Sequence, residues 1–146
     1  MIIEASKTYI DDLVELGHMF FNETAFKAVT DWDSDLARNG FLGLMESPNA
    51  SFVIYIKDGK VAGMAAGFVS DLWFSHDKMG QELFWYVMPK YRGKSGFKLL
   101  SNLECDLRKK GATIIDMVCL CDGMDFTKAY VNRGYFASEK HFLKRA

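Results

Sequence analysis

A strand, a short basic loop and an amphipathic helix follow one another between residues 82 and 110, and this order restricts the fold more than any other feature. Residues 82–88 are rich in aromatic side chains, and Pro89 ends the run. The following helix carries leucines on one side and ends in basic residues, which suit the negative end of its dipole. Because another apolar run follows over 113–120, the segment predicts a βαβ unit with a locally parallel sheet.

The chain before this unit predicts a strand, two helices and a hairpin. A short strand is expected over 1–5, followed by a helix that Thr8 caps and by a second helix that begins near Asp33. The β-rich residues 51–69 predict a hairpin, because Asp58-Gly59 fits a tight primed turn. The fold class is therefore α/β.

Two further features concern the sheet and the end of the chain. Gly63 and Gly67 lie inside the second hairpin strand, where glycines indicate a bulge or a close backbone approach. After the βαβ unit, a short helix is expected over 126–133, with Gly134 in position to end it. One or two final strands are expected over 135–143.

Length and composition exclude several classes of protein. The 146 residues favour a single domain over 1–146, and the net charge of −1 gives no global field that would attract nucleic acid. No apolar run is long enough to cross a bilayer, so we expect no membrane partner. Three cysteines suit a reducing cytoplasm better than a disulfide framework, and Cys119-x-Cys121 lacks the spacing of a zinc site. We therefore expect a cytoplasmic protein without a metal.

The loop over 90–96 predicts a phosphate-bearing ligand. Backbone N–H groups at a helix N-terminus have no intrahelical acceptor and, with the helix dipole, attract anions. Gly93 and Gly96 allow the backbone to approach a phosphate closely. Three cations add charge-assisted contacts, namely Arg92, Lys94 and Lys98.

The same segment resembles the signature of the GNAT acetyltransferases. Members carry V-x-P-x-[YH]-R-G-x-G-x-G-x-x-L-L at a strand–loop–helix junction, and this chain follows it at Val87, Pro89, Tyr91, Arg92, Gly93 and Leu99-Leu100. The family's closing Y-x-x-x-G-[FY] is present from Tyr130 to Tyr135. The loop departs from the pattern, because R-G-K-S-G-F lacks one glycine and is one residue shorter before the leucine pair.

This resemblance implies a fold and an activity. The GNAT fold has a mixed central sheet of about six or seven strands, flanked by about four helices and splayed between strands 4 and 5. The implied activity is an acetyl-CoA-dependent N-acetyltransferase that acts by direct transfer in a ternary complex. The acceptor would be a primary amine of a small molecule or a protein, and its identity stays open. Dimers are common in the family, so a homodimer also stays open.

The resemblance also assigns roles to residues at the junction. The backbone of Tyr86, Val87 and Met88 would contact the acetyl-pantetheine arm, and one N–H would polarise the acetyl carbonyl. The pyrophosphate would lie on the loop formed by Arg92, Gly93, Lys94, Ser95, Gly96 and Phe97. Tyr130 matches the tyrosine that protonates the departing thiolate; the alternative is an aromatic core residue.

Candidates for the acceptor side come from the residues themselves. Glu82 is the first candidate for the general base, because it opens an apolar strand where burial would raise its pKa; the alternative is a solvated carboxylate. Glu23 is a candidate for holding the amine, and His76 is a second base candidate in a loop. Trp73 lies in the same loop and is a candidate wall of the acceptor site or a dimer contact.

Two other functions compete with catalysis. The altered loop suits a catalytically inactive module of the same fold that senses acyl-CoA or binds a protein. RNA binding is the second competitor, since basic residues of 90–98 lie beside aromatic ones. Against RNA, the chain has 19 acidic and 18 basic residues and no complete RNP1 motif.

Overall fold

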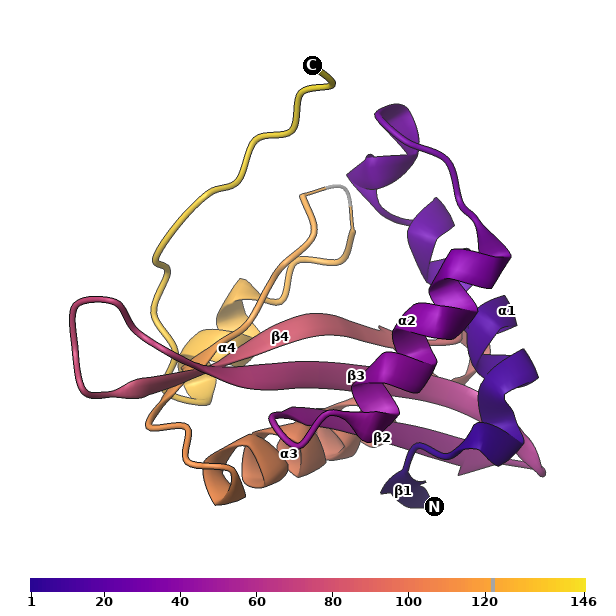
Figure 1. Ribbon diagram of the computed structural model, residues 1–146, viewed down its shortest axis with the longest axis horizontal. Coiled ribbons are helices and arrows are strands. Elements are labelled where there is room, and N and C mark those ends of the chain that lie inside the picture. The colour runs from indigo at the N-terminus through magenta and orange to yellow at the C-terminus, as the bar shows by residue number, and fades with distance from the viewer. Residues whose placement is uncertain (122) are drawn as a thin grey trace.

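The computed structural model describes residues 1–121 and 123–146, which form one five-stranded mixed sheet with helices on both faces (Figure 1). The strand order in space is β1-β2-β3-β4-β5. The strands are β1 (Ile2–Glu4), β2 (Ala50–Lys57), β3 (Lys60–Asp71), β4 (Lys78–Val87) and β5 (Ile114–Asp116). The first four strands pair antiparallel with one another, and β5 pairs parallel with β4. This parallel pair confirms the βαβ unit.

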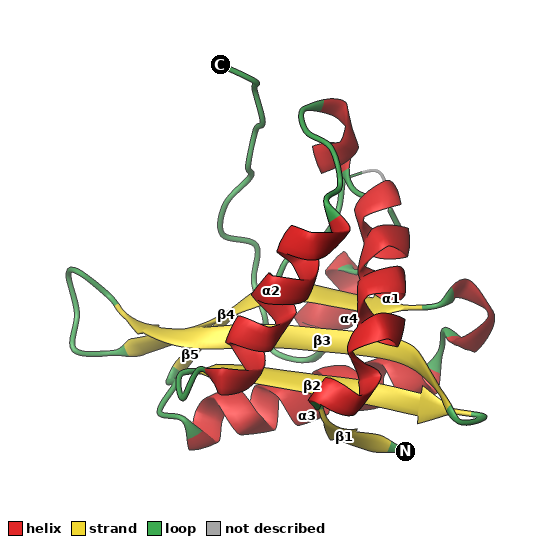
Figure 2. Ribbon diagram, turned by 45° about the vertical axis from the view of Figure 1, so that its right-hand side comes forward, coloured by secondary structure: helices red, strands yellow, loops and turns green. Residues whose placement is uncertain are grey.

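Helices cover the two faces of the sheet in different ways (Figure 2). Helices α1 (Ile10–Asn22) and α2 (Ser34–Glu46) pack on one face, and α3 (Lys94–Lys109) packs on the other. Helix α4 (Thr127–Asn132) lies beside α3, since Arg133 directly after it binds Glu104 of α3. Three short 3-10 helices complete the described elements: η1 (Lys7–Tyr9), η2 (Ala25–Ala28) and η3 (Pro89–Tyr91).

The local signals in the N-terminal half were mostly right. Asp33 caps α2, and its carboxylate accepts hydrogen bonds from the N–H groups of Asp35 and Leu36. Asp58 and Gly59 have φ angles of 52° and 76°, which confirms the primed hairpin turn. The cap at Thr8 was wrong, because residues 7–9 form η1 and α1 begins only at Ile10.

A bulge interrupts the pairing of β3 with β4. Ala66 pairs with Phe84 and Gly67 pairs with Glu82, so Leu83 has no partner across the ladder. A Cβ atom on Gly67 would lie 2.6 Å from the carbonyl oxygen of Gln81, and no side chain fits there. The close backbone approach predicted at Gly67 is therefore confirmed, and the bulge separates the two halves of β4.

The final strands expected over 135–143 are absent, so the sheet has five strands instead of six or seven. The physical reason is that β5 pairs over only three residues and leaves little edge on which further strands could form. The tail instead runs away from the sheet (Figure 1), and its Arg145 Nη1 donates a hydrogen bond of 2.8 Å to the carbonyl of Val29. Phe142 in this tail is 90% exposed.

The core has one layer on each side of the sheet. On the α3 side, Leu99, Leu103 and Leu107 are fully buried, and burying each contributes about 1.5–3 kcal/mol. On the other side, Phe41, Phe52 and neighbouring aromatic residues pack between the sheet and helices α1 and α2. Within the described residues, no helix has the length and apolar character needed to cross a membrane.

Candidate active site

The strands β4 and β5 separate after the pair of Gln81 with Asp116. Just beyond this pair, the Glu82 side chain replaces a ladder contact, because its Oε2 accepts a 2.9 Å hydrogen bond from the N–H of Val118. The expected fifth strand over 113–120 thus ends early, at Asp116. The result is a splay between β4 and β5 that begins at a carboxylate.

Glu82 is a buried acid in the middle of a strand, because β4 begins at Lys78 and not at Glu82 as the sequence indicated. Its relative exposure is 8%. Burial raises its pKa to about 7; the hydrogen bond from Val118 opposes this rise, and the charge of Asp116 adds to it. A carboxyl group with such a pKa exchanges protons near neutrality.

Tyr130 reaches the same peptide from the other side of the splay. Its hydroxyl donates a 2.8 Å hydrogen bond to the carbonyl of Val118. Burial raises the pKa of Tyr130, and the nearby Glu82 raises it further, so the phenol keeps its proton. Glu82 and Tyr130 therefore share one peptide group: the acid binds the Val118 N–H and the phenol binds its carbonyl.

The phosphate loop predicted from sequence leads into α3, which begins at Lys94. Gly93 occupies the N-cap with φ of +133°, and a Cβ atom there would meet nothing within 4 Å. The space beside Gly93 is thus open, directly before the first turn of α3. A groove of about 440 Å³ runs beside the same turn, lined by Lys94, Phe97 and Lys98 among others.

Trp85 carries an unsatisfied donor next to this turn. Its indole Nε1 is buried and has no hydrogen-bond partner in the described part of the chain. The ring lies near Phe97, Phe126 and Tyr130, with ring centroids 5.7, 4.9 and 6.3 Å away. A buried N–H without a partner is costly, so this donor is a feature that ordinary core packing does not explain.

Arg92 and Glu23, predicted for different substrates, form one ion pair. Arg92 Nη2 lies 2.8 Å from Glu23 Oε2, and its Nε donates to the carbonyl of Val87 at 2.8 Å. The Tyr86 hydroxyl donates to Glu23 Oε1 at 2.9 Å, and burial together with Glu23 raises the pKa of Tyr86 to about 12. The guanidinium of Arg92 is therefore directed at Glu23, which follows α1.

The other candidates on the acceptor side lie elsewhere. Trp73 and His76 belong to the loop between β3 and β4, which projects away from α1 and α2 (Figure 1). Trp73 is 93% exposed and packs only edge-on against Phe74 among described rings. The structure does not bring these two side chains to the splay. The described residues also contain no group of three or more potential ligands placed to hold a metal ion.

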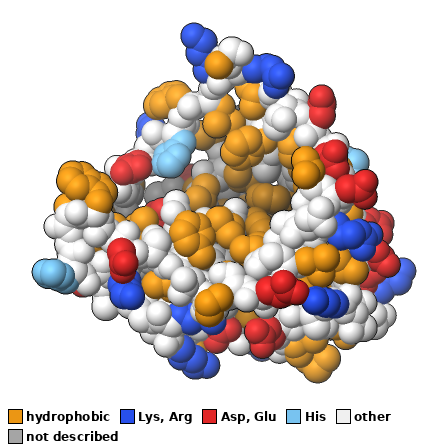
Figure 3. Space-filling model, in the orientation of Figure 1, with side chains coloured by type: hydrophobic (Ala, Val, Ile, Leu, Met, Phe, Trp, Pro, Cys, Tyr) orange, Lys and Arg blue, Asp and Glu red, His pale blue; other side chains and the backbone are white. Residues whose placement is uncertain are grey.

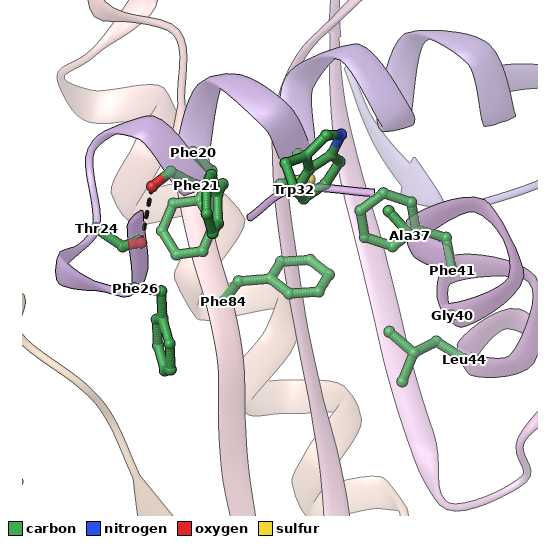
Figure 4. Close-up of a pocket in the computed structure, with 12 residues that line it drawn as sticks. Phe20, Phe21, Thr24, Phe26, Trp32, Ala37, Gly40, Phe41, Leu44 and Phe84 are labelled. Atoms are coloured by element: carbon green, nitrogen blue, oxygen red, sulfur yellow. Dashed lines mark hydrogen bonds between the residues drawn. The ribbon is translucent and has the colours of Figure 1, made fainter. Parts of the chain in front are cut away.

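An apolar cavity of about 470 Å³ lies on the face covered by α1 and α2 (Figure 4). Phe84, two residues after Glu82 in β4, lines it between side chains from α1 and α2. Sequence reasoning missed this cavity, because its lining residues come from five separate segments of the chain and resemble ordinary core residues.

Comparison with known proteins identifies the family. The family model described as acetyltransferase (GNAT) family matches residues 11–135. The chain belongs to the GNAT family of acetyltransferases. This GNAT protein is thus an N-acetyltransferase of a family that uses acetyl-CoA as cosubstrate.

The individual relatives share only a small part of their sequence with this chain. An aminoalkylphosphonate N-acetyltransferase from Salmonella typhimurium is 26% identical over 113 residues, which cover 77% of this chain and 73% of that protein. The structure of an aminoglycoside 6′-N-acetyltransferase bound to a CoA–acetylneamine bisubstrate analogue has a TM-score of 0.79 at 13% identity, covering 100% of this chain and 97% of that one. A second aminoglycoside 6′-N-acetyltransferase, from Acinetobacter haemolyticus, has a TM-score of 0.73 at 17% identity, covering 100% and 99%. These structural matches confirm the GNAT fold.

Proposed function

We propose that this protein transfers the acetyl group of acetyl-CoA directly to a primary amine while both substrates are bound. The observation that carries the proposal is the meeting of Glu82 and Tyr130 on the Val118 peptide at the splay. One group is a carboxyl with a pKa of about 7 and the other is a phenol that keeps its proton. Acetyl transfer to an amine needs both: a group that takes a proton and a group that gives one.

The residues around the splay fit an acetyl-CoA molecule. The open turn at Gly93 and the first N–H groups of α3 would hold the pyrophosphate, with Lys94 and Lys98 beside it. The backbone of 86–88 would contact the pantetheine arm, and so would the indole N–H of Trp85, which has no partner among the described residues. Acetyl-CoA supplies the thioester carbonyl that the amine attacks.

Each proton in the proposed reaction has a donor and an acceptor. The amine binds as the free base and its nitrogen attacks the thioester carbonyl, which makes that nitrogen positively charged; Glu82 takes the proton that the nitrogen then loses. The new N–C bond forms as the C–S bond breaks, and Tyr130 gives its proton to the sulfur. Tyr130 then regains a proton from solvent and Glu82 releases one, so the residues end as they began.

Ligand-dependent unfolding tests the cofactor assignment. A ligand that binds only the folded state stabilises it by RT ln(1 + [L]/Kd), which is about 2.7 kcal/mol at a hundredfold excess over Kd. We expect acetyl-CoA and desulfo-CoA to raise Tm and ATP at the same concentration to have little effect. Equal shifts with all three ligands, or none, would contradict the proposal.

Steady-state kinetics of Tyr130→Phe test the acid. Loss of a general acid lowers turnover by about 10²–10⁴-fold, and the KM for acetyl-CoA should change little. Tyr135→Phe is the matched control, because this tyrosine packs at a tilt against Tyr130, with ring centroids 5.5 Å apart, but donates its hydroxyl to Glu104 of α3. Equal kcat values for Tyr130→Phe and the unmodified protein would remove Tyr130 from the mechanism. Stabilisation by CoA without turnover on any amine would instead favour an inactive acyl-CoA-binding module.

A further inference from the structure

The apolar cavity on the α1/α2 face has the size of a small-molecule site. Its volume of about 470 Å³ falls within the roughly 300–1,000 Å³ usual for such sites. In Figure 4, Phe20, Phe21 and Phe26 lie on one side and Phe41 and Leu44 of α2 on the other, with Phe84 between them. Figure 3 shows hydrophobic side chains gathered around a hollow on the face seen in Figure 1.

The lining offers almost no polar partner to a ligand. Among the described residues that line the cavity, none is charged. The Thr24 hydroxyl is already bonded, since it donates to the carbonyl of Phe21 at 2.8 Å. Trp32 Nε1 donates to Ser34 Oγ at 2.9 Å. A ligand with an ionic or strongly polar body would lose its hydration here without compensation.

Two residues of the cavity lining lie close in the sequence to residues of the candidate active site. Phe84 follows Glu82 across the bulge, and β5 no longer covers this part of β4 after the Gln81–Asp116 pair. Thr24 follows Glu23, whose carboxylate is bound by Tyr86 and Arg92. A molecule seated on Phe84 therefore lies beside the splayed half of β4.

We propose that this cavity binds the aromatic body of the acceptor, so that the substrate is a primary amine joined through a short linker to an aromatic ring. This inference rests on the proposed N-acetyltransferase activity and names its substrate class. Rings of Phe20, Phe84 and Trp32 offer edge and face contacts to a bound ring. The class differs from an aminoalkylphosphonate, which carries an anionic group, and from an aminoglycoside, which carries several ammonium and hydroxyl groups.

Two glycines of α2 provide a matched pair of variants. A Cβ atom on Gly40 or on Gly43 would meet nothing within 4 Å, so both sites have room for a side chain. Gly40 lines the cavity and Gly43 does not. Gly40→Phe would therefore place a ring in the cavity, and Gly43→Phe makes the same change three residues later in the same helix. Gly40→Leu replaces Gly40→Phe if the larger variant does not fold.

The test compares phenethylamine, 2-aminoethylphosphonate and kanamycin as acceptors, with CoA release as the readout. We expect kcat/KM to be at least roughly tenfold higher for phenethylamine, a ratio within reach of apolar pocket contacts. Gly40→Phe should lower kcat/KM for phenethylamine at least about tenfold with the KM for acetyl-CoA unchanged, and Gly43→Phe should not. A preference for either polar amine, or equal kcat/KM in the Gly40 and Gly43 variants, would overturn the inference.

Calorimetric titration with phenethylamine separates this inference from the proposed function. Binding that Gly40→Phe abolishes and Gly43→Phe keeps would support the cavity assignment even if no amine were acetylated, in which case only the activity would fail. Absence of binding in the presence of saturating desulfo-CoA would overturn the cavity assignment whatever the activity. A Gly40→Phe defect seen with octanoyl-CoA as donor, but not with phenethylamine, would assign the cavity to the acyl chain and also overturn it.

Discussion

The two faces of the sheet differ in how closely their side chains are packed. On the α3 face, leucines at 99, 103 and 107 repeat at helical spacing and are fully buried. On the α1/α2 face, aromatic rings surround a cavity of about 470 Å³, and α2 carries two glycines with open space beside them. Close-packed aliphatic residues give stability, whereas an unfilled aromatic layer leaves room for a ligand. Helix α3 thus supplies the close-packed layer, while α1 and α2 leave the room in which we propose that the acceptor binds.

The largest expected effect is the difference in stability between truncating a side chain on the α3 face and truncating one on the α1/α2 face. Leu103→Ala should lower the free energy of unfolding by about 2–5 kcal/mol, because it leaves a hole in a fully buried layer. Phe26→Ala should cost less than about 1 kcal/mol, because Phe26 is half exposed and already borders empty space. Urea denaturation of both variants measures the difference. Equal losses would mean that the two faces contribute alike and would break the comparison.

Glu82 lies at the boundary between the faces and should make stability depend on pH. Its folded pKa of about 7 lies above the ordinary value of 4.5, so the folded state favours the neutral acid. Stabilisation is complete below pH 4.5 and is lost as pH rises through 7, by about 3 kcal/mol in total. Glu82→Gln, which can still accept from Val118, should remove this pH dependence. Unfolding measured at pH 5 and pH 8 checks it; parallel pH dependence in both proteins would locate the titration elsewhere.

The ion pair between Glu23 and Arg92 should contribute less. Both side chains are more than one-third exposed, so solvent screens their attraction. Glu23→Gln should lower the free energy of unfolding by less than about 1 kcal/mol. The same change should bring the pKa of Tyr86 down from about 12, because Glu23 is one cause of its rise. Ultraviolet titration of phenolate reports this pKa, and an unchanged value would leave burial as its sole cause.

The smallest expected effect is a gain in stability from α2. Gly40→Ala and Gly43→Ala should each raise the free energy of unfolding by about 0.5–1 kcal/mol, because alanine loses less backbone freedom in a helix and meets no neighbour at either site. Thermal unfolding of both single variants measures this. A gain at Gly43 alone would show that even a methyl group at Gly40 disturbs the cavity wall, which would sharpen the distinction between the two positions.

Features encoded by neighbouring residues could be predicted from the sequence. The Asp58-Gly59 turn, the start of α2 near Asp33 and the βαβ unit all depend on spacing within one segment. The end of β5 could not be predicted, because it depends on a side chain 36 residues earlier, Glu82, that binds the Val118 N–H in place of a strand. The prediction of final strands over 135–143 was wrong for a related reason. These residues look β-like, but a strand there would need a sheet edge that β5 does not offer.

The same distinction between local and distant residues applies to the candidate site. The family resemblance named Tyr130 and the turn at Gly93 as candidates, because both belong to short motifs. The donor of Trp85 and the shared peptide of Val118 have no sequence pattern, since one is an atom without a partner in the described part of the chain and the other is backbone. Trp73 was chosen for its aromatic character, which says nothing about the direction in which a loop projects.

The shared Val118 peptide makes Glu82 and Tyr130 an electrically coupled pair. A negative carboxylate on the N–H draws electron density toward the carbonyl oxygen, which then holds the Tyr130 proton more strongly. Once Glu82 has accepted the proton of the amine, that polarisation falls and the phenol is freer to donate elsewhere. In the proposed reaction, the peptide thus sets the order of the two proton transfers. Protonation of Glu82 weakens the hold of the Val118 carbonyl on the Tyr130 proton, so the leaving sulfur is protonated after the amine nitrogen has lost its proton.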